Sequence, residues 1–364
     1  MTDKETQLLK AVEAGDLEQV KTLIEESVNV NCQDERGRSP LMIATQQNNL
    51  EMAKLLIDAG GDVNQRDNML LTPWICAAAN GFHKILKAGA PKADITLVNR
   101  FGGTALLPSS EKGFLKAVDV AIQSDVPVNH VNDLEWTALQ EAVILGDGQA
   151  LYSLIIRLLM DNGADPTTLD NDGKTALDWA KEYEQSYIES LLKKEIDRSQ
   201  PDEKLIDAIL GHISKEEYQE ANEKADKGIS EFSRRVFYFL KGYTFILQDK
   251  YEQGIRIYEE ALTLSDGKPE FYFYLANAYR EQKQIDKAIE TYRKAIDMDP
   301  DYFFYRYHLS NYLRELGRHE EAIKEMDVLL EQNPHRYDYA FHKANSLRVL
   351  GKEKAADELL SQFK

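Results

Sequence analysis

Apolar residues in the first 200 positions recur in one order, in which a Ser or Thr is followed by Pro or Ala and then by Leu or Trp. The phrase begins at Ser39, Thr72, Thr104, Thr137 and Thr175, at steps of 33, 32, 33 and 38 residues. Ser or Thr accepts a hydrogen bond from the first turn of a helix, and a Pro after it has no N–H to leave unpaired. A second apolar stretch follows, as in residues 52–57 before Ala59 and Gly60, where a helix would end. The pattern predicts two short helices in each unit.

From Arg235 the period becomes 34 residues, with small or aromatic residues returning at that step. The small residues are Gly254, Ala288, Ala322 and Ala356. They predict places where two helices pack closely. Pro300 and Pro334 are expected to end helices, because Pro cannot continue one.

A fixed period of this length is typical of solenoids, in which each repeat packs only on its neighbours. The sequence therefore predicts an all-α protein with two helical-repeat solenoids in tandem. Charged residues fill positions 181–204, and the natural boundary is Ser199-Gln200-Pro201-Asp202. We expect a first domain over 1–198, a linker and degenerate helix pair over 199–234, and a second domain over 235–364.

The phrases of the first domain resemble ankyrin repeats over about residues 5–195, as six units with the last a charged cap. The first unit lacks the Thr-Pro phrase, the third is degenerate after Phe82, and the fourth carries Pro108 in its first helix. Trp74 and Trp179 occupy positions within the phrase, which predicts that they pack in the core. The resemblance implies a protein-binding module.

The second domain resembles tetratricopeptide repeats over about residues 235–364, as four units with a degenerate one ahead. The phrase from Leu275 to Tyr279, followed by Ala288 and Pro300, carries the resemblance. The early Trp of that family is missing, and Tyr238 and Tyr272 occupy its place in the first two units. The resemblance implies that the first helix of each pair lines a concave groove.

The predicted turn tips of the ankyrin-like domain are unusually apolar. Leu70 and Glu135 stand where the family usually has Gly, two residues before the Thr. Because a row of exposed apolar side chains is unfavourable unless something covers it, we expect a partner-binding ridge. Its members are Met69, Leu70, Phe101, Leu134 and Trp136. The alternative is that these side chains fold back on their own hairpins.

Three sets of residues repeat at 34 positions on the expected groove helices. They are Phe239, Phe273, Tyr307 and Phe341; Asn277, Asn311 and Asn345; and Arg280, Arg314 and Arg348. Within a unit they lie four and three residues apart, so they share one helix face. Asn can bind a peptide backbone with its donor and its acceptor, and Arg can bind a carboxylate. We expect a groove for an extended peptide that is acidic or ends in a free carboxylate; a structural role for Asn and a solvated Arg face remain the alternative.

The last helix would leave Leu359, Leu360 and Phe363 without a cover if the array ends at Lys364, because such arrays normally end in a solvating helix. These residues are therefore expected to pair with a second copy of the chain or with another protein. Pairing with a second copy would make the protein a homodimer.

The formal charge of −18 comes from 62 acidic and 44 basic residues, and residues 1–200 carry −12 of it (31 acidic, 19 basic). An acidic chain disfavours nucleic acid and suggests a basic partner. A membrane span is not expected, since no run of about 18 apolar residues occurs. Cys32 and Cys76 read as buried thiols of a cytoplasmic protein. The seven His residues lack metal-ligand spacing and no phosphate loop occurs, so we expect no metal, no cofactor and no catalysis.

The sequence favours a non-catalytic adaptor or scaffold. It would bind one protein on the ankyrin-like face and a peptide in the tetratricopeptide-like groove. Two alternatives from other classes of function remain. One is an immunity-type inhibitor of a single basic enzyme or toxin, and the other is a secreted effector directed at a host.

Overall fold

The computed structural model describes residues 1–264 and 268–363; Lys364, the last residue of the predicted second domain, lies outside them. Regular structure in the described residues is helical, with one isolated bridge between Val131 and Thr137. The chain divides into two compact units, Met1–Ile196 (unit 1) and Asp197–Lys364 (unit 2). The predicted fold class, two helical-repeat solenoids, is confirmed. Among the described residues, none of the helices has the length and apolar character needed to cross a bilayer.

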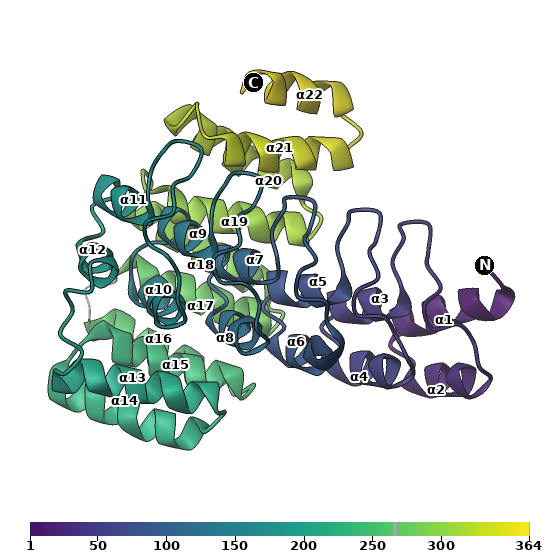
Figure 1. Cartoon of the computed structure of the whole chain (residues 1–364), viewed down its shortest axis with the longest axis horizontal. Helices are drawn as coiled ribbons and strands as arrows, with labels where there is room; N and C mark the ends of the chain where they lie inside the picture. Colours follow the sequence, from purple (N-terminus) through teal and green to yellow (C-terminus); the bar gives the residue numbers. More distant parts are fainter. Residues whose placement is uncertain (265–267, 364) are drawn as a thin grey trace. The chain divides into compact units, whose positions relative to one another are not determined.

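Unit 1 consists of six helix pairs joined by hairpin-like loops. Its elements are α1 (Asp3–Ala14), α2 (Leu17–Glu25), α3 (Pro40–Gln46), α4 (Leu50–Asp58), α5 (Pro73–Ala79), α6 (His83–Gly89), η1 (Ala90–Lys92), α7 (Leu106–Glu111), α8 (Leu115–Gln123), α9 (Ala138–Ile144), α10 (Ala150–Asp161), α11 (Ala176–Glu182) and α12 (Ser186–Leu192). The odd-numbered helices pack on one another in sequence, and from α4 onward so do the even-numbered ones. Figure 1 shows these two rows, with the loops projecting in parallel from the odd-numbered row.

The capping residues of the phrase begin the odd-numbered helices as predicted. Ser39 accepts from the amide of Met42 at 3.1 Å, and Thr72 accepts from Ile75 at 3.1 Å. Thr104 is the exception. Helix α7 begins only at Leu106, and the buried Thr104 hydroxyl has no hydrogen-bond partner in the described part of the chain. The unit that carries Pro108 therefore departs from its neighbours.

One side chain holds each hairpin together. Its Oδ1 atom accepts the amides of the residues two and four positions further on, at 2.8–3.1 Å. These residues are Asp34, Asp67, Asn99, Asn132 and Asp170, each five positions before the Ser or Thr of the phrase. Such a side chain closes a turn that the backbone alone leaves open.

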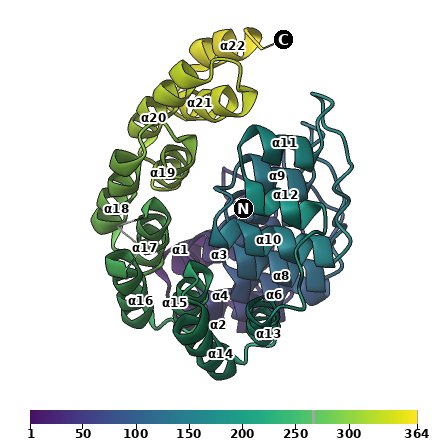
Figure 2. The same ribbon diagram turned by 90° about the vertical axis from the view of Figure 1, so that its left-hand side faces the viewer.

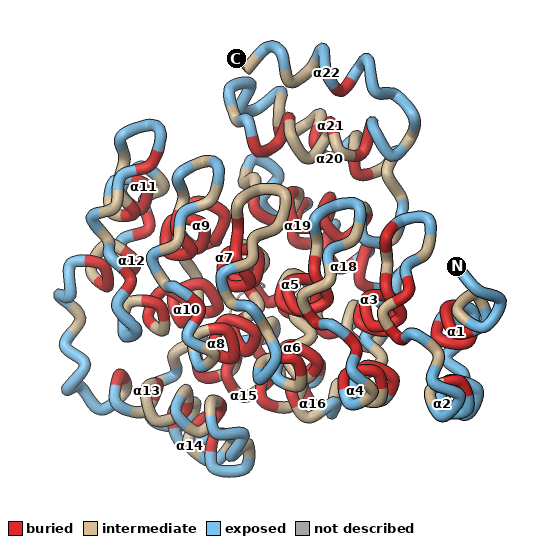
Figure 3. The backbone as a smooth tube through the Cα atoms, turned by 45° about the vertical axis from the view of Figure 1, so that its right-hand side comes forward, coloured by how far each residue is buried: buried red, intermediate tan, exposed pale blue. Residues whose placement is uncertain are grey.

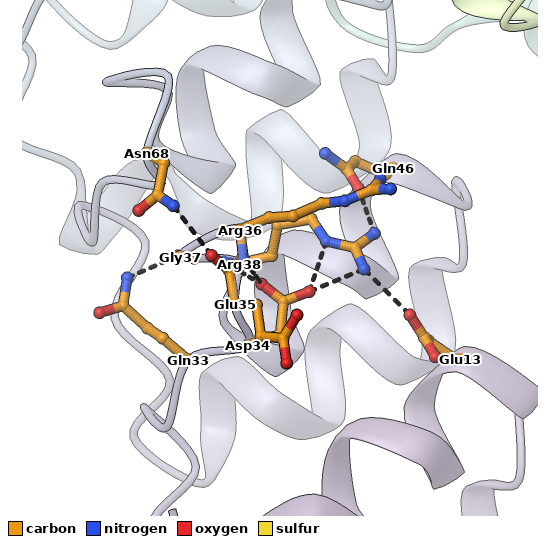
Figure 4. A network of polar contacts seen from close by, with 9 residues as sticks. All are labelled: Glu13, Gln33, Asp34, Glu35, Arg36, Gly37, Arg38, Gln46 and Asn68. Atoms are coloured by element: carbon orange, nitrogen blue, oxygen red, sulfur yellow. Dashed lines mark hydrogen bonds and ion pairs between the residues drawn. The ribbon is translucent and has the colours of Figure 1, made fainter. Parts of the chain in front are cut away.

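The first hairpin is also tied to its neighbours, as Figure 4 shows. Arg38 donates to Asp34 at 2.7 Å and reaches Glu13 of α1 at 3.0 Å. On the other side, Asn68 of the second hairpin donates to the carbonyl of Glu35 at 3.0 Å. Consecutive hairpins are therefore fixed relative to one another by side chain to main chain bonds.

The core of unit 1 lies between the two helix rows, while the hairpin tips are mostly exposed (Figure 3). Trp74 and Trp179 are buried, as predicted. The indole N–H of Trp74 donates to the carbonyl of Leu86 at 2.9 Å, and that of Trp179 donates to Asp170 at 2.6 Å. The thiols of Cys32 and Cys76 are buried, as predicted.

Unit 2 consists of five antiparallel helix pairs. They are α13 (Pro201–Ser214), α14 (Tyr218–Phe232), α15 (Arg235–Leu247), α16 (Tyr251–Leu264), α17 (Pro269–Glu281), α18 (Ile285–Met298), α19 (Phe303–Glu315), α20 (His319–Gln332), α21 (Tyr337–Val349) and α22 (Glu353–Ser361). Each helix packs on the next one in sequence. Figure 2 shows them following one another along a curved stack.

Close approach in unit 2 depends on residues with little or no side chain. Ala288, Ala322 and Ala356 have no exposed surface, as expected from their 34-residue spacing. A Cβ atom on Gly228 would overlap the ring of Phe237, and one on Gly242 would overlap the ring of Tyr258. Aromatic rings therefore fill the space that small residues leave between helices.

We predict that Gly228→Ala destabilises unit 2, whereas Gly211→Ala stabilises it. The new methyl group at 228 meets the Phe237 ring, and overpacking of this kind costs about 1–3 kcal/mol. Apart from the backbone of its own helix and its chain neighbours, no atom of the described residues lies within 4 Å of a Cβ placed on Gly211, so the helix gains roughly 0.5–1 kcal/mol from Ala. Urea unfolding of both variants measures the change in the free energy of unfolding, which should fall for Gly228→Ala and rise for Gly211→Ala. Equal changes in the two variants would contradict the packing explanation.

Candidate functional site

The predicted ridge residues lie in three adjacent hairpins of unit 1. Met69 and Leu70 are exposed, at 51% and 47% of their full surface. Phe101, Leu134 and Trp136 are half-buried. The guanidinium of Arg100 lies 4.7 Å from the centre of the Phe101 ring, and its Nη1 is 3.7 Å from the sulfur of Met69. The structure therefore brings the second and third tips together and leaves Met69 and Leu70 the most exposed of the five.

Leu70 and Glu135 adopt the left-handed backbone conformation, with φ of 59° and 58°. The equivalent residues of the other hairpins are Gly37, Gly102 and Gly173, with φ of 71–73°. A left-handed conformation costs a residue with a Cβ atom about 1–2 kcal/mol. The hairpins therefore impose on Leu70 and Glu135 a strain that glycine would avoid.

The sequence analysis missed two apolar residues on the same hairpins. Val131 and Leu169 are exposed at 40% and 58%. Each stands six positions before the Thr of its phrase, at Thr137 and Thr175. This shared position is the signal that the sequence offers for them. We call Met69, Leu70, Val131 and Leu169 the hairpin-edge residues.

The last hairpins of unit 1 are surrounded by acidic residues. From residue 113 to 173 the only Lys and Arg residues are Lys116 and Arg157, and both are 2% exposed. Six acidic residues of this stretch are exposed: Asp125, Asp133, Glu135, Asp161, Asp165 and Asp172. Lys116 forms an ion pair with Asp119 at 2.7 Å. The surface of this part of unit 1 is therefore negative, as the charge count suggested.

Glu141 of α9 is a buried carboxyl group, 6% exposed, behind the fourth hairpin. Its Oε1 accepts from Asn132 at 2.8 Å, while its Oε2 has no hydrogen-bond partner among the described residues. Burial raises the pKa of Glu141 well above its ordinary value, and the nearby charge of Glu111 raises it further. Because Asn132 closes the hairpin with its other amide atom, the protonation of Glu141 is linked to that turn.

Most of the predicted groove aromatics of unit 2 are core residues, which corrects the prediction that they form a groove surface. Phe239, Phe273 and Tyr307 are at most 2% exposed. Phe239 packs 4.6 Å from Tyr274, and Phe273 packs 4.8 Å from Phe304, between ring centres. Phe341 alone is half-buried. Large rings repeat at this position because they fill the space between consecutive helix pairs.

The Arg residues predicted for the groove already have partners within the chain. Arg280 forms an ion pair with Glu315 at 2.9 Å and lies 5.4 Å from the ring centre of Tyr312. Arg348 forms an ion pair with Asp357 at 2.8 Å, and Arg314 is hydrogen-bonded to His342. A ligand carboxylate would therefore have to compete with Glu315 and Asp357.

The Asn residues of the predicted groove retain unused hydrogen-bonding groups. Asn311 is 3% exposed, and neither atom of its amide has a partner in the described part of the chain. The Nδ2 of Asn345 is likewise buried without a partner. Asn277 accepts from the hydroxyl of Tyr292 at 2.5 Å. Buried amides are nearly always bonded, so Asn311 and Asn345 depart from the usual pattern.

The apolar residues predicted for self-association pack partly within unit 2. Leu359 and Leu360 lie against the buried cluster of Ala344, Leu347 and Ala356. The ring of Phe363 is 6.0 Å from that of Tyr337 between centres. Pairing of two copies through these residues remains a prediction. Among the described residues, no three His, Cys, Asp or Glu side chains gather in a way that could hold a metal ion.

The chain is similar to two families of repeat proteins. The model for ankyrin repeats (three copies) matches residues 8–90 and 106–202. Models for the tetratricopeptide repeat match residues 237–267, 269–302 and 291–324. The resemblances noted from the repeated phrases are thereby confirmed.

Among curated proteins, the chain is 36% identical over 186 residues to YahD of Escherichia coli (strain K12), which is named as an ankyrin repeat protein. The match covers 50% of this chain and 92% of YahD. The chain is also 36% identical over 94 residues to protein phosphatase 1 regulatory subunit 12A of Mus musculus, covering 26% of this chain and 9% of that protein.

Among solved structures, an ankyrin repeat domain from Acinetobacter baumannii AYE aligns with a TM-score of 0.51 and 42% identity. It covers 52% of this chain and 97% of its own length. A further ankyrin repeat protein aligns with a TM-score of 0.51 and 37% identity, covering 53% and 98%.

We predict that Glu141→Gln stabilises unit 1 at neutral pH. A raised pKa means that Glu141 stabilises the fold fully below its unfolded value of 4.5, and that this stability is lost as the pH rises through the folded value. Gln keeps the acceptor for Asn132 and cannot ionise. We therefore expect the two proteins to differ little near pH 4.5 and the variant to be more stable by about 1 kcal/mol or more at pH 8.

The measurement is thermal unfolding at constant ionic strength across this pH range. Glu135→Gln, which removes an exposed acid from the same repeat, is the matched control and should leave the pH profile unchanged. Parallel profiles for wild type and Glu141→Gln would contradict the prediction.

Proposed function

Because the chain belongs to the ankyrin repeat proteins and carries tetratricopeptide repeats in its second unit, we propose that it is a non-catalytic adaptor with two binding surfaces. Unit 1 binds a protein with its hairpin side, and unit 2 binds an extended peptide. Both repeat families are typically interaction modules, and their stacked units offer extended surfaces. The buried thiols of Cys32 and Cys76 suit a reducing compartment, so we place the adaptor in the cytoplasm.

The observation that carries the peptide proposal is the amide of Asn311. The amide is buried in α19, and neither its donor nor its acceptor has a partner among the described residues. Leaving such a group unsatisfied costs about 1–3 kcal/mol, and because the side chain is only 3% exposed, a bound main chain recovers this cost when the covering side chains move aside and admit its C=O and N–H. Asn345 adds a second donor 34 residues later, on the equivalent helix α21. Spaced amides of this kind bind a peptide through its backbone.

The charge of the ligand follows from the Arg residues. A peptide carboxylate, either terminal or on a side chain, would replace Glu315 at Arg280 or Asp357 at Arg348. The second exchange is the easier one, since the Asp357 side chain is 70% exposed and the Glu315 side chain is 25% exposed. We therefore place the carboxylate of an acidic or C-terminal ligand at Arg348.

Two surfaces on one chain make the binding of a single partner stronger than either contact alone, if that partner reaches both. They equally allow two different proteins to be held together. The acidic surface of unit 1 favours a basic protein there, while unit 2 takes the acidic peptide.

We predict that Asn311→Leu abolishes peptide binding and raises the stability of unit 2. Replacing an unsatisfied buried amide by an apolar group of similar size removes a cost of about 1–3 kcal/mol. Peptides are selected from a displayed random library on the immobilised full chain, and their affinities are then measured by fluorescence anisotropy. The expected loss for the variant is tenfold or more, equivalent to about 1.4 kcal/mol.

The control is Asn222→Leu in the degenerate pair, outside the three Asn positions of the groove; because Asn222 accepts from the hydroxyl of Thr244, this variant should lose stability and keep its affinity. A stabilised Asn311→Leu variant that binds the selected peptides as tightly as wild type would refute the groove. A library that yields no peptide would refute it as well.

A further inference from the structure

We propose that the hairpin edge of unit 1 docks a protein face with an apolar centre and a rim of Lys and Arg, and that Leu70 is its anchor. The proposal rests on the proposed function of unit 1 as a protein-binding surface and specifies the partner's chemistry. It combines backbone strain, exposure of apolar side chains, charge and rigidity, each of which is visible at named residues.

The first observation is that the left-handed position of the hairpins is one at which the fold favours glycine. A Cβ atom on Gly37 would lie 2.5 Å from the Oδ1 of Asn68, and one on Gly102 would overlap Asp133. Glycine is therefore enforced at these tips by the next hairpin. Leu70 stands at the equivalent place with a φ of 59°, so it carries a strain that glycine would avoid. Strained residues that the fold does not need concentrate at binding sites.

The second observation is that the side chain of the strained residue is exposed. Leu70 and its neighbour Met69 are among the large apolar residues with most exposed surface, together with Leu169 and Val131 of later hairpins. Exposed apolar residues scattered singly are ordinary, whereas a set on one edge of a solenoid marks an interaction site. Figure 3 shows the hairpin tips lying in a row at this edge.

The third observation is charge, which identifies the partner. The hairpin-edge residues at 131 and 169 lie within the stretch that has six exposed acidic residues, and whose two basic residues are buried. Complementary charge speeds association and excludes wrong partners. A partner whose Lys and Arg residues face these later hairpins, and whose apolar patch faces Met69 and Leu70 beside Arg100, satisfies both features.

The fourth observation is that the edge is already ordered. The Oδ1 of Asp67 accepts from Met69 at 2.8 Å and from Leu71 at 2.9 Å, and so fixes the residues on both sides of Leu70. Asn68 donates its main-chain amide to the carbonyl of Arg36 at 3.0 Å. A preformed surface loses little conformational entropy on binding, which favours affinity.

The test uses the full chain and a fluorescent amphipathic helical peptide of about 18 residues with Leu on one face and Lys on the other. A peptide with Glu in place of Lys is the charge control. We expect the Leu/Lys peptide to bind wild type with an affinity that falls as salt rises, and the Leu/Glu peptide to bind at least tenfold more weakly.

Leu70→Gly is the decisive variant, because it should raise the melting temperature and weaken the Leu/Lys peptide tenfold or more. Glu184→Gly is its matched control. Glu184 is exposed and left-handed, with φ of 53°, in the turn between α11 and α12, so its replacement should also raise the melting temperature but leave affinity unchanged. Met69→Ser, which leaves the backbone strain in place, should weaken the peptide without stabilising the fold.

The outcomes separate this inference from the proposed function. If the peptide binds wild type and Leu70→Gly equally, unit 1 still binds a basic partner and only the assignment of Leu70 and the hairpin edge fails. If the Leu/Glu peptide binds as tightly as the Leu/Lys peptide, the charge argument fails. If neither peptide binds wild type, both the inference and the proposed role of unit 1 are refuted.

Discussion

The arrangement of unit 1 depends on one repeated hydrogen-bonding device, an Asp or Asn oxygen that accepts two amides of its own hairpin. It recurs at five positions with nearly constant distances. Because the same turn closes in each repeat, equivalent residues fall on one edge of the stack. The device also dictates a left-handed residue three positions after the Asp or Asn. Three repeats have Gly at this position, and the other two have Leu70 and Glu135. The repeats therefore differ in whether this exposed position carries a side chain.

In the described part of unit 2, the repeats stack through aromatic rings and small residues and not through hydrogen-bonded hairpins. Aromatic rings and small residues alternate between its helices, as Phe237 beside Gly228 and Tyr258 beside Gly242 illustrate. Asn311 and Asn345, whose buried amides keep atoms without a hydrogen-bond partner among the described residues, lie on the first helices of their pairs, α19 and α21. Unit 1 therefore exposes apolar side chains along its hairpins, and its later hairpins are acidic. Unit 2 buries its aromatic rings and contains buried amides without a hydrogen-bond partner among the described residues. We propose on this basis that the two surfaces bind ligands of opposite charge.

The period of the sequence predicts the fold well, because each repeat packs only on its neighbours and local pattern is nearly sufficient. The caps at Ser39 and Thr72, the buried Trp74 and Trp179, and the small residues at 288, 322 and 356 all lie where the pattern places them. Thr104 is an exception, since the repeat that contains Pro108 begins its helix later.

The candidate sites were less predictable, because a period shows which residues are equivalent and not which way they face. Phe239, Phe273 and Tyr307 repeat as regularly as groove residues would, yet they are buried. Arg280 fits a carboxylate, but Glu315 of the next repeat already occupies it. Conversely, Val131 and Leu169 were overlooked, because their exposure depends on how each hairpin is held by its neighbours.

The central claim is that one Asp oxygen holds Leu70 in its exposed, strained conformation before any partner binds. Site-resolved amide hydrogen exchange of the free full chain, compared with Asp67→Ala, tests it most directly. The account predicts that the amides of Met69 and Leu71 exchange slowly in wild type and rapidly in the variant, with the helices of unit 1 unaffected. Rapid exchange of both amides in wild type, or no change in the variant, would contradict it.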